Sequence, residues 1–98
     1  MKKDTTYDIA VKRTRRILKD RRNELNMTQT ELASAIGLKQ PVISRLETDR
    51  SSKINLGTLH KAAQILGLSV VLDLVPENRA ELLMEEMDGS VRNTRNSG

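Results

Sequence analysis

Residues 39–47, with the sequence KQPVISRLE, carry the side chains that are best suited to binding chemistry in this chain. At helical spacing, Gln40, Ser44 and Arg45 share one side of a short helix, and apolar residues occupy the other side. An amide, a hydroxyl and a guanidinium supply hydrogen-bond donors and acceptors and one positive charge. The pattern predicts a helix that packs on one side and presents a polar surface on the other.

Groups suited to catalysis or metal binding are scarce. The chain has no cysteine, which removes disulfides, thiolate nucleophiles and cysteine metal sites and fits a reducing cytosol. His60 is the only histidine and lies within an expected helix without a triad partner, so we interpret it as structural. Glu85 and Glu86 lack metal-ligand spacing with any histidine or aspartate, and the single aromatic, Tyr7, argues against stacking on single strands. We expect no enzyme, no cofactor and no metal.

Length and charge bound the class of protein. The 98 residues suffice for one small domain, and a single aromatic residue requires an aliphatic core. Residues 1–26 carry nine basic and four acidic side chains, residues 27–72 carry five and three, and residues 73–98 carry three and six. The excess of positive charge in residues 1–26 suits binding to a polyanion such as nucleic acid. The alternative interpretation is that these charges only form a solvated face of a helix. No apolar run approaches the ~20 residues of a membrane span, and the start lacks the apolar region of a signal peptide.

Five helices are expected to position these residues. They are predicted over residues 8–26, 29–36, 40–48, 56–66 and 77–87. On the first of them one apolar stripe is expected, formed by Val11, Ile17, Leu18 and Leu25. Thr28 and Glu31 match a capping box at the start of the second helix, and Gly37 suits a left-handed turn after it. Pro41 lies in the first turn of the third helix, where its missing N–H has no intrahelical acceptor anyway. The last helix is short, acidic and amphipathic.

A single strand is predicted over LSVVLDLV, residues 68–75, because β-branched residues dominate this segment and Pro76 ends it. One strand cannot satisfy its own backbone hydrogen-bonding groups, and no second strand is evident. Pairing with the same strand of a second copy, in a two-fold dimer, is the economical solution. The residues expected to form this dimer contact are Ser69, Val70, Val71, Leu72, Asp73 and Leu74.

The second and third helices, separated by a glycine turn, form a helix-turn-helix. Ala33 must be small because the third helix crosses close above it, and Gly37 makes the turn four residues later. Ile43 and Leu46 then hold the third helix on the domain. Through TQTELASAIGLKQPVISRLE, residues 14–67 resemble the Xre/phage-repressor helix-turn-helix family. The alternative is a helical hairpin used only for packing.

This resemblance implies a mostly α, lambda-repressor-like helix-turn-helix bundle, to which the predicted strand adds one C-terminal β-strand pairing across a dimer. The chain is then expected to divide into a flexible N-terminus at 1–7, a DNA-binding domain at 8–67, a dimerisation strand at 68–76, a short amphipathic helix at 77–87 and a disordered tail at 88–98.

In that family the second helix of the motif enters the major groove of double-stranded DNA. The residues that the resemblance places at base edges or nearby phosphates are Lys39, Gln40, Pro41, Ser44 and Arg45. Glutamine suits adenine, arginine suits guanine, and the proline ring suits a thymine methyl. The residues expected to contact backbone phosphates are Thr28, Gln29, Thr48, Arg50, Ser52, Lys53 and Asn55. Gln29 also matches a family position that braces the first recognition residue.

Two further positions are interpreted through the same resemblance. An arginine on the first helix and a glutamate ending the motif commonly form a buried or half-buried pair in this family, and Arg22 and Glu47 match these positions. We therefore expect a structural ion pair. Lys39 departs from the family pattern, because many relatives carry serine or threonine there as a helix cap, and lysine cannot accept the N–H bond.

The strand adds a second resemblance, to the HipB-type antitoxins. It implies a cytoplasmic, nucleoid-associated homodimer that binds a palindromic operator, represses its own operon and neutralises a HipA-like kinase toxin. Residues 77–98 are where such a partner would dock, and the alternative for 77–87 is a dimer-packing helix. Three other functions stay open: a stand-alone Xre regulator without a toxin partner, a regulator that answers to a small ligand, and a module used mainly for protein interaction.

Overall fold

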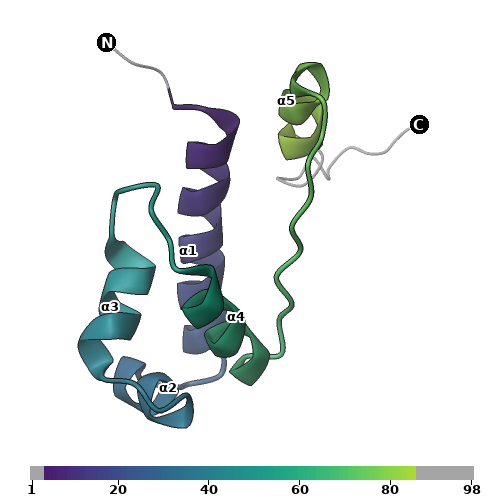
Figure 1. Ribbon diagram of the computed structural model, residues 1–98. Coiled ribbons are helices and arrows are strands. Elements are labelled where there is room, and N and C mark those ends of the chain that lie inside the picture. Colours follow the sequence, from purple (N-terminus) through teal and green to yellow (C-terminus); the bar gives the residue numbers. More distant parts are fainter. Residues whose placement is uncertain (1–3, 86–98) are drawn as a thin grey trace.

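The computed structural model describes residues 4–85, in which five helices follow one another (Figure 1). They are α1 Thr6–Glu24, α2 Gln29–Ala35, α3 Gln40–Thr48, α4 Leu56–Ile65 and α5 Glu77–Glu85. The prediction of a mostly helical chain is confirmed for the residues that the structure describes. The tail expected at 88–98, the last two residues of the helix expected to reach 87, and residues 1–3 of the expected flexible start lie outside the described residues.

Side-chain caps determine where α1 and α2 begin. Thr5 and Asp8 form a capping box, in which the Thr5 hydroxyl accepts from the Asp8 N–H at 3.1 Å and the Asp8 carboxylate accepts from the Thr5 N–H at 2.9 Å. This box explains why α1 starts at Thr6, two residues before the predicted start. Thr28 and Glu31 form the equivalent box at the start of α2, at the position that the sequence predicted.

Left-handed backbone conformations lie between the helices. Asn26 has φ of 56° in the turn after α1, and Gly37 has φ of 73° in the turn after α2. The Leu38 N–H donates to the Ala33 carbonyl at 2.8 Å and closes the second turn. A glycine at position 37 adopts this conformation without the steric cost that a side chain would add. The turn is short, so α3 must cross directly over α2.

One aliphatic core lies between α1, α2, α3 and α4 (Figure 1). Leu32 and Ile43 are 0% exposed, and Ala33 beneath α3 is 1% exposed, which agrees with the need for a small residue there. The largest fully buried side chains are Leu18, Leu32, Ile43 and Leu66. An interior this closely packed fixes the position of α3 on the domain.

The inward face of α1 differs from the prediction. Ile17 and Leu25 were expected on the apolar stripe, but they are 37% and 43% exposed. The buried positions are instead Val11, Arg15, Leu18 and Arg22. Their spacing of four, three and four residues follows the helical repeat, so two arginines lie on the face that packs against the rest of the domain.

No strand is formed within residues 4–85, and the segment between α4 and α5 runs without regular secondary structure (Figure 1). Val71 is 85% exposed and Leu74 is 97% exposed. A single chain offers this segment no neighbouring strand to pair with. The strand and its pairing across a dimer therefore stay a prediction.

Helix α5 follows this segment and packs against α1, beside its N-terminal half (Figure 1). Leu82 remains 61% exposed, so an apolar side chain of α5 is left uncovered in the single chain. Among the helices described, none is both long enough and apolar enough to traverse a lipid bilayer.

Candidate nucleic-acid interface

The outer side of α3 gathers the residues expected to read bases. Gln40, Pro41, Ser44 and Arg45 line a hollow of about 510 Å³, together with residues at the end of the helix. Pro41 and Arg45 are exposed, whereas Gln40 and Ser44 are half-buried. The opposite side of α3 is buried in the core, which leaves this side free to meet a ligand.

Lys39 lies at the N-cap of α3, and its side chain makes no cap hydrogen bond. Pro41 follows within the first turn, so one of the amide donors that a cap would satisfy is already absent. The exposed ammonium of Lys39 therefore stands at the leading end of α3 and is not engaged in holding the helix start.

A chain of hydrogen bonds connects this surface to the interior. The Gln40 Nε2 donates to the Gln29 Oε1 at 2.6 Å, and the Gln29 Nε2 donates to the Glu47 Oε1 at 3.0 Å. Gln29 lies in the first turn of α2, and Glu47 lies in the last turn of α3. Gln29 thus holds the Gln40 side chain and restricts the orientation of its amide.

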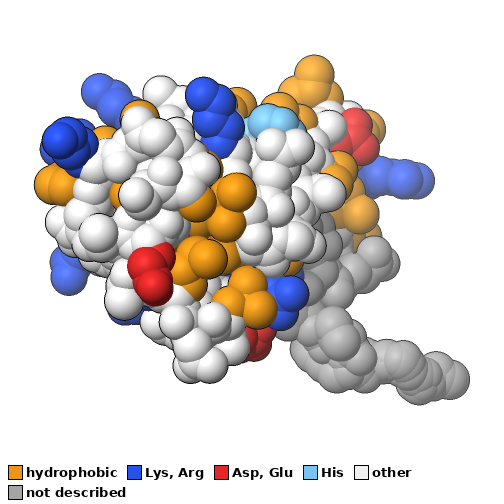
Figure 2. Space-filling model, turned by 90° about the horizontal axis from the view of Figure 1, so that it is seen from below, with side chains coloured by type: hydrophobic (Ala, Val, Ile, Leu, Met, Phe, Trp, Pro, Cys, Tyr) orange, Lys and Arg blue, Asp and Glu red, His pale blue; other side chains and the backbone are white. Residues whose placement is uncertain are grey.

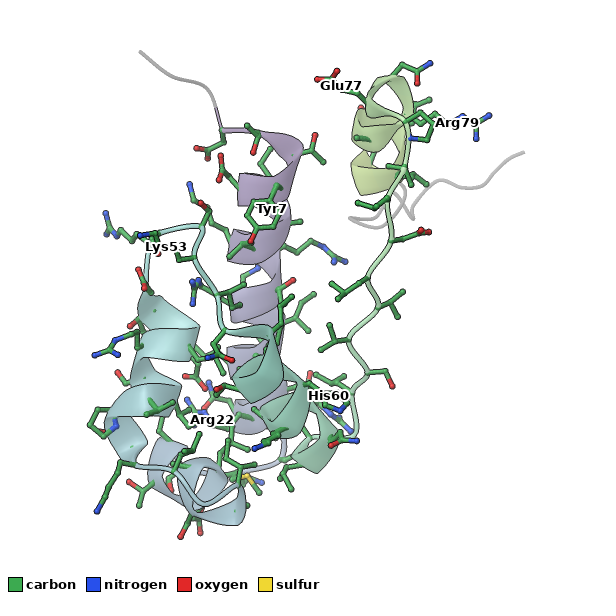
Figure 3. The ribbon with its side chains drawn as sticks, in the orientation of Figure 1. Tyr7, Arg22, Lys53, His60, Glu77 and Arg79 are labelled. Carbon is green, nitrogen blue, oxygen red and sulfur yellow. The ribbon has the colours of Figure 1, made fainter. Side chains whose placement is uncertain are left out.

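The chain ends in an ion pair between α1 and α3. The Arg22 Nε donates to the Glu47 Oε2 at 2.6 Å, and the Arg22 Nη2 donates to the Glu47 Oε1 at 3.0 Å. The Arg22 Nη1 also donates to the Met27 carbonyl at 2.6 Å. The hydrogen bonds to Glu47 raise the pKa of Arg22, although burial opposes this. Figure 3 shows Arg22 among the helices, where this pair joins α1 to the end of α3.

Arg15 is a site residue that the sequence analysis missed. Its guanidinium donates to four backbone carbonyls: Arg45 at 3.3 Å, Leu46 at 2.7 Å, Ser51 at 3.2 Å and Lys53 at 2.6 Å. It is 4% exposed. One buried side chain therefore holds both the end of α3 and the loop between α3 and α4. Its position seven residues before Arg22, on the same face of α1, was the signal that could have revealed it.

The residues expected to meet phosphates fall into two groups beside α3. Thr28 and Gln29 lie at the start of α2, and the other group follows the end of α3. Within that second group Arg50 and Lys53 are exposed, and Lys53 points outward from the loop (Figure 3). In Figure 2, Lys and Arg side chains project from the edge of the molecule on the side of α3.

Several members of the second group also have structural tasks. The Thr48 hydroxyl donates to the Ser44 carbonyl at 2.7 Å, and the Asn55 Oδ1 accepts from the Thr58 N–H at 2.9 Å as the cap of α4. Ser52 is half-buried in the loop between them. These side chains shape the surface around α3, and a phosphate contact from them would be an added role.

Asp49 lies at the C-cap of α3. Its Oδ1 accepts from the Ser51 N–H at 2.8 Å, and this backbone hydrogen bond lowers its pKa, with help from the nearby Arg15 and Arg45 charges. The carboxylate is therefore ionised at neutral pH and stabilises the turn that starts the loop.

The residues expected to form the dimer lie away from this surface. Ser69, Val71, Leu72, Asp73 and Leu74 are exposed. Val70 alone of the expected set is half-buried, because it packs against the core. His60 is exposed on α4 (Figure 3). No group of metal-ligating side chains was found within the described part of the chain.

Comparison with known proteins identifies the class of this domain. Residues 18–72 match the helix-turn-helix family of the Xre and lambda-repressor type, which is more than half of the chain. The protein belongs to this family of DNA-binding transcriptional regulators. No curated protein and no solved structure matched the chain. The matched region contains α2, α3 and α4 entirely, so it includes the whole surface built around α3.

Proposed function

We propose that this protein is a sequence-specific, homodimeric repressor that binds a palindromic operator and serves as the antitoxin of a HipA/HipB-type module. The DNA-binding part of this proposal is supported by the outer side of α3 in a helix-turn-helix domain, where the Gln40 amide, the Ser44 hydroxyl and the Arg45 guanidinium line one hollow. A repressor of this kind works at the nucleoid, in the cytoplasm. The direct test is binding to the DNA upstream of its own gene: equal affinity for random duplex at moderate salt would refute the repressor.

In the proposed complex α3 lies in the major groove with its N-terminal residues leading. Gln40 pairs with an adenine, and Arg45 donates to the O6 and N7 of a guanine. Lys39, Pro41 and Ser44 face the neighbouring base edges or phosphates. The phosphate-contacting residues lie on both sides of α3, at the start of α2 and in the loop before α4. These contacts set the register and the salt dependence of binding and leave the choice of sequence to α3.

Arg45→Ala is expected to reduce discrimination at one base position by about 1–3 kcal/mol, because a bidentate pair to guanine is lost. Arg50→Ala is expected to weaken binding to every sequence alike, because a phosphate carries no sequence information. Fluorescence anisotropy with the upstream duplex and single-base variants of it measures both effects at one salt concentration. A uniform loss of affinity in the Arg45 variant would remove that residue from the base-reading set.

The dimer is proposed to form through residues 68–76. The support is physical: Val71, Leu72 and Leu74 are 85%, 70% and 97% exposed in the single chain, which is unfavourable for adjacent apolar side chains in water. An antiparallel pair of these segments, related by a two-fold axis, would cover them and satisfy their backbone groups. Two such domains then present two copies of α3 to successive turns of the major groove.

Val71→Pro and Leu72→Pro, made separately, test this dimer. Adjacent N–H groups of a strand point to opposite edges, so one of the two substitutions must remove a ladder hydrogen bond. We expect that variant to dissociate at concentrations where the parent is dimeric, as measured by analytical ultracentrifugation. Val71→Thr, which keeps the N–H and the β-branch, is the matched control. If both proline variants stayed fully dimeric, the strand would not be the dimer contact.

The antitoxin role rests on the acidic C-terminal part of the sequence, in which helix α5 carries an uncovered apolar side chain, Leu82. A kinase encoded by the adjacent gene should co-purify with this chain, and truncation after Pro76 should abolish the interaction. Full partner binding by the truncated chain would exclude α5 and the residues after it. An adjacent gene of another kind would favour the second candidate, a stand-alone regulator.

A further inference from the structure

A basic cleft of about 450 Å³ lies between α1 and the end of α3. Its walls include Arg16 and Lys19 of α1 and Arg50 of the loop after α3, and Arg15 forms part of its floor. The residues proposed above to read bases lie on the outer side of α3, so the cleft is a separate surface of the domain. None of the α1 side chains in it has a role in the DNA contacts described so far.

The exposed cations of the cleft form a row along α1. Lys12, Arg16 and Lys19 are spaced at four and three residues, so they lie on one face of the helix. Like charges at this spacing destabilise a helix by about 0.2–0.5 kcal/mol per pair. Lys12 forms a surface ion pair with Asp4 at 2.7 Å. Within residues 4–85, Arg16 and Lys19 have no ion-pair partner to offset the repulsion.

The two carboxylates at the cleft are already engaged. Glu47 accepts from Arg22 and Gln29, and Asp49 accepts from the Ser51 N–H. Neither forms an ion pair with the exposed cations of the cleft in the described part of the chain. The lining therefore holds five cationic side chains against two anionic ones, and it keeps an excess of positive charge.

Arg15 adds a buried charge under this surface. Its four hydrogen bonds go to neutral carbonyls, and the nearby Asp49 carboxylate accepts instead from the Ser51 N–H. Its Nε is buried without a hydrogen-bond partner among residues 4–85. The partial negative charge at the end of α3 offsets only part of one unit charge. The potential of the cleft is therefore positive from its floor as well as from its walls.

We propose that this cleft binds phosphate groups of the DNA backbone beyond those that flank α3. Asp49 lines both the cleft and the hollow on α3, so the two surfaces adjoin at the end of that helix. A duplex seated on α3 would continue from there toward the basic row of α1. The proposal rests on the proposed DNA binding and extends its footprint, and bound phosphates would relieve the repulsion among Lys12, Arg16 and Lys19.

The test is the salt dependence of DNA binding by the double variant Arg16→Gln/Lys19→Gln. Each phosphate neutralised by the protein contributes about 0.9 to the slope of the logarithm of the association constant against the logarithm of salt concentration. This slope is negative, and we expect its magnitude to decrease by about 1.8 per bound protomer when both contacts are removed. The matched control is Lys61→Gln, an exposed cation of α4 outside the cleft, for which we expect the parent slope.

Measurement on both the upstream duplex and a random duplex separates this proposal from the proposed function. Loss of operator preference by the parent protein would refute the repressor, yet the slope on random duplex would still report the phosphates in the cleft. A parent-like slope for the double variant on both duplexes would overturn the cleft proposal. The proposal would also fail if Lys61→Gln reduced the magnitude of the slope as much as the double variant does. The substitutions remove like-charge repulsion, so the thermal midpoint should stay equal to or above that of the parent.

Discussion

Arg22→Met is expected to lower the free energy of unfolding by about 3–5 kcal/mol, because it leaves the Glu47 carboxylate buried without its counter-charge. The Glu47 side chain has a relative exposure of 0%, so water cannot replace the lost donors. Domains of this size have unfolding free energies near the lower end of about 5–15 kcal/mol. The variant would therefore be largely unfolded at modest urea concentrations, which urea titration followed by circular dichroism measures directly.

A double variant separates the cost of the stranded charge from the value of the pair. Arg22→Met/Glu47→Leu removes both charges, and exchange of a buried ion pair for apolar residues is often neutral or stabilising. We expect it to recover most of the stability that Arg22→Met loses. A double variant as unstable as the single one would show that the hydrogen bond from Arg22 to Met27, and not the charge, holds the turn after α1.

Arg15→Met is expected to weaken binding to all DNA sequences and to destabilise the domain. One hydrogen bond from a charged donor is worth about 1.5–3 kcal/mol, and Arg15 makes four, so the loss of stability should reach at least that of one such bond. The loop that carries Arg50 and Lys53 would lose its attachment to α1. Affinity for operator and random duplex should then fall in parallel, as measured by anisotropy well below the thermal midpoint.

Arg15→Lys is the matched variant for this experiment. Lysine keeps the positive charge, but a single ammonium cannot reach carbonyls of both α3 and the loop in the way that the planar guanidinium does. We expect an intermediate stability and a DNA affinity closer to that of Arg15→Met. Full affinity in the lysine variant would mean that charge alone matters at this position and that the hydrogen bonds to the loop do not position its phosphate contacts.

The sequence predicted the helical elements well, because their signals are local. The capping box at Thr28, the glycine at position 37 and the proline in the first turn of α3 each specify a helix boundary within a few residues. The start of α1 was predicted two residues late, because the capping box made by Thr5 and Asp8 was not used.

The sequence revealed less about the buried polar groups. Arg15 lies in a run of basic residues and differs in the sequence from the exposed Arg16 only by its spacing of seven residues from Arg22. The packing of α1 against α3 is what buries it. The cleft has the same origin, because its cations come from α1 and from the loop after α3, more than thirty residues apart in the chain. Strand pairing between copies depends on a second chain, and it stays a prediction.

The hydrogen-bonded chain from Arg22 to Gln40 has a consequence for the direction in which a base pair is read. The Glu47 carboxylate accepts from the Arg22 guanidinium and from the Gln29 amide, so Gln29 turns its amino group toward Glu47 and its carbonyl toward Gln40. Gln40 must then present its amino group to Gln29, and its amide cannot be reversed. In the proposed complex this fixed orientation of the Gln40 amide suits an A·T base pair with adenine on one strand, and it disfavours the T·A pair with adenine on the other strand. A charge in the core of the domain thereby sets the polarity of a group at its surface, and Glu47→Gln would release it.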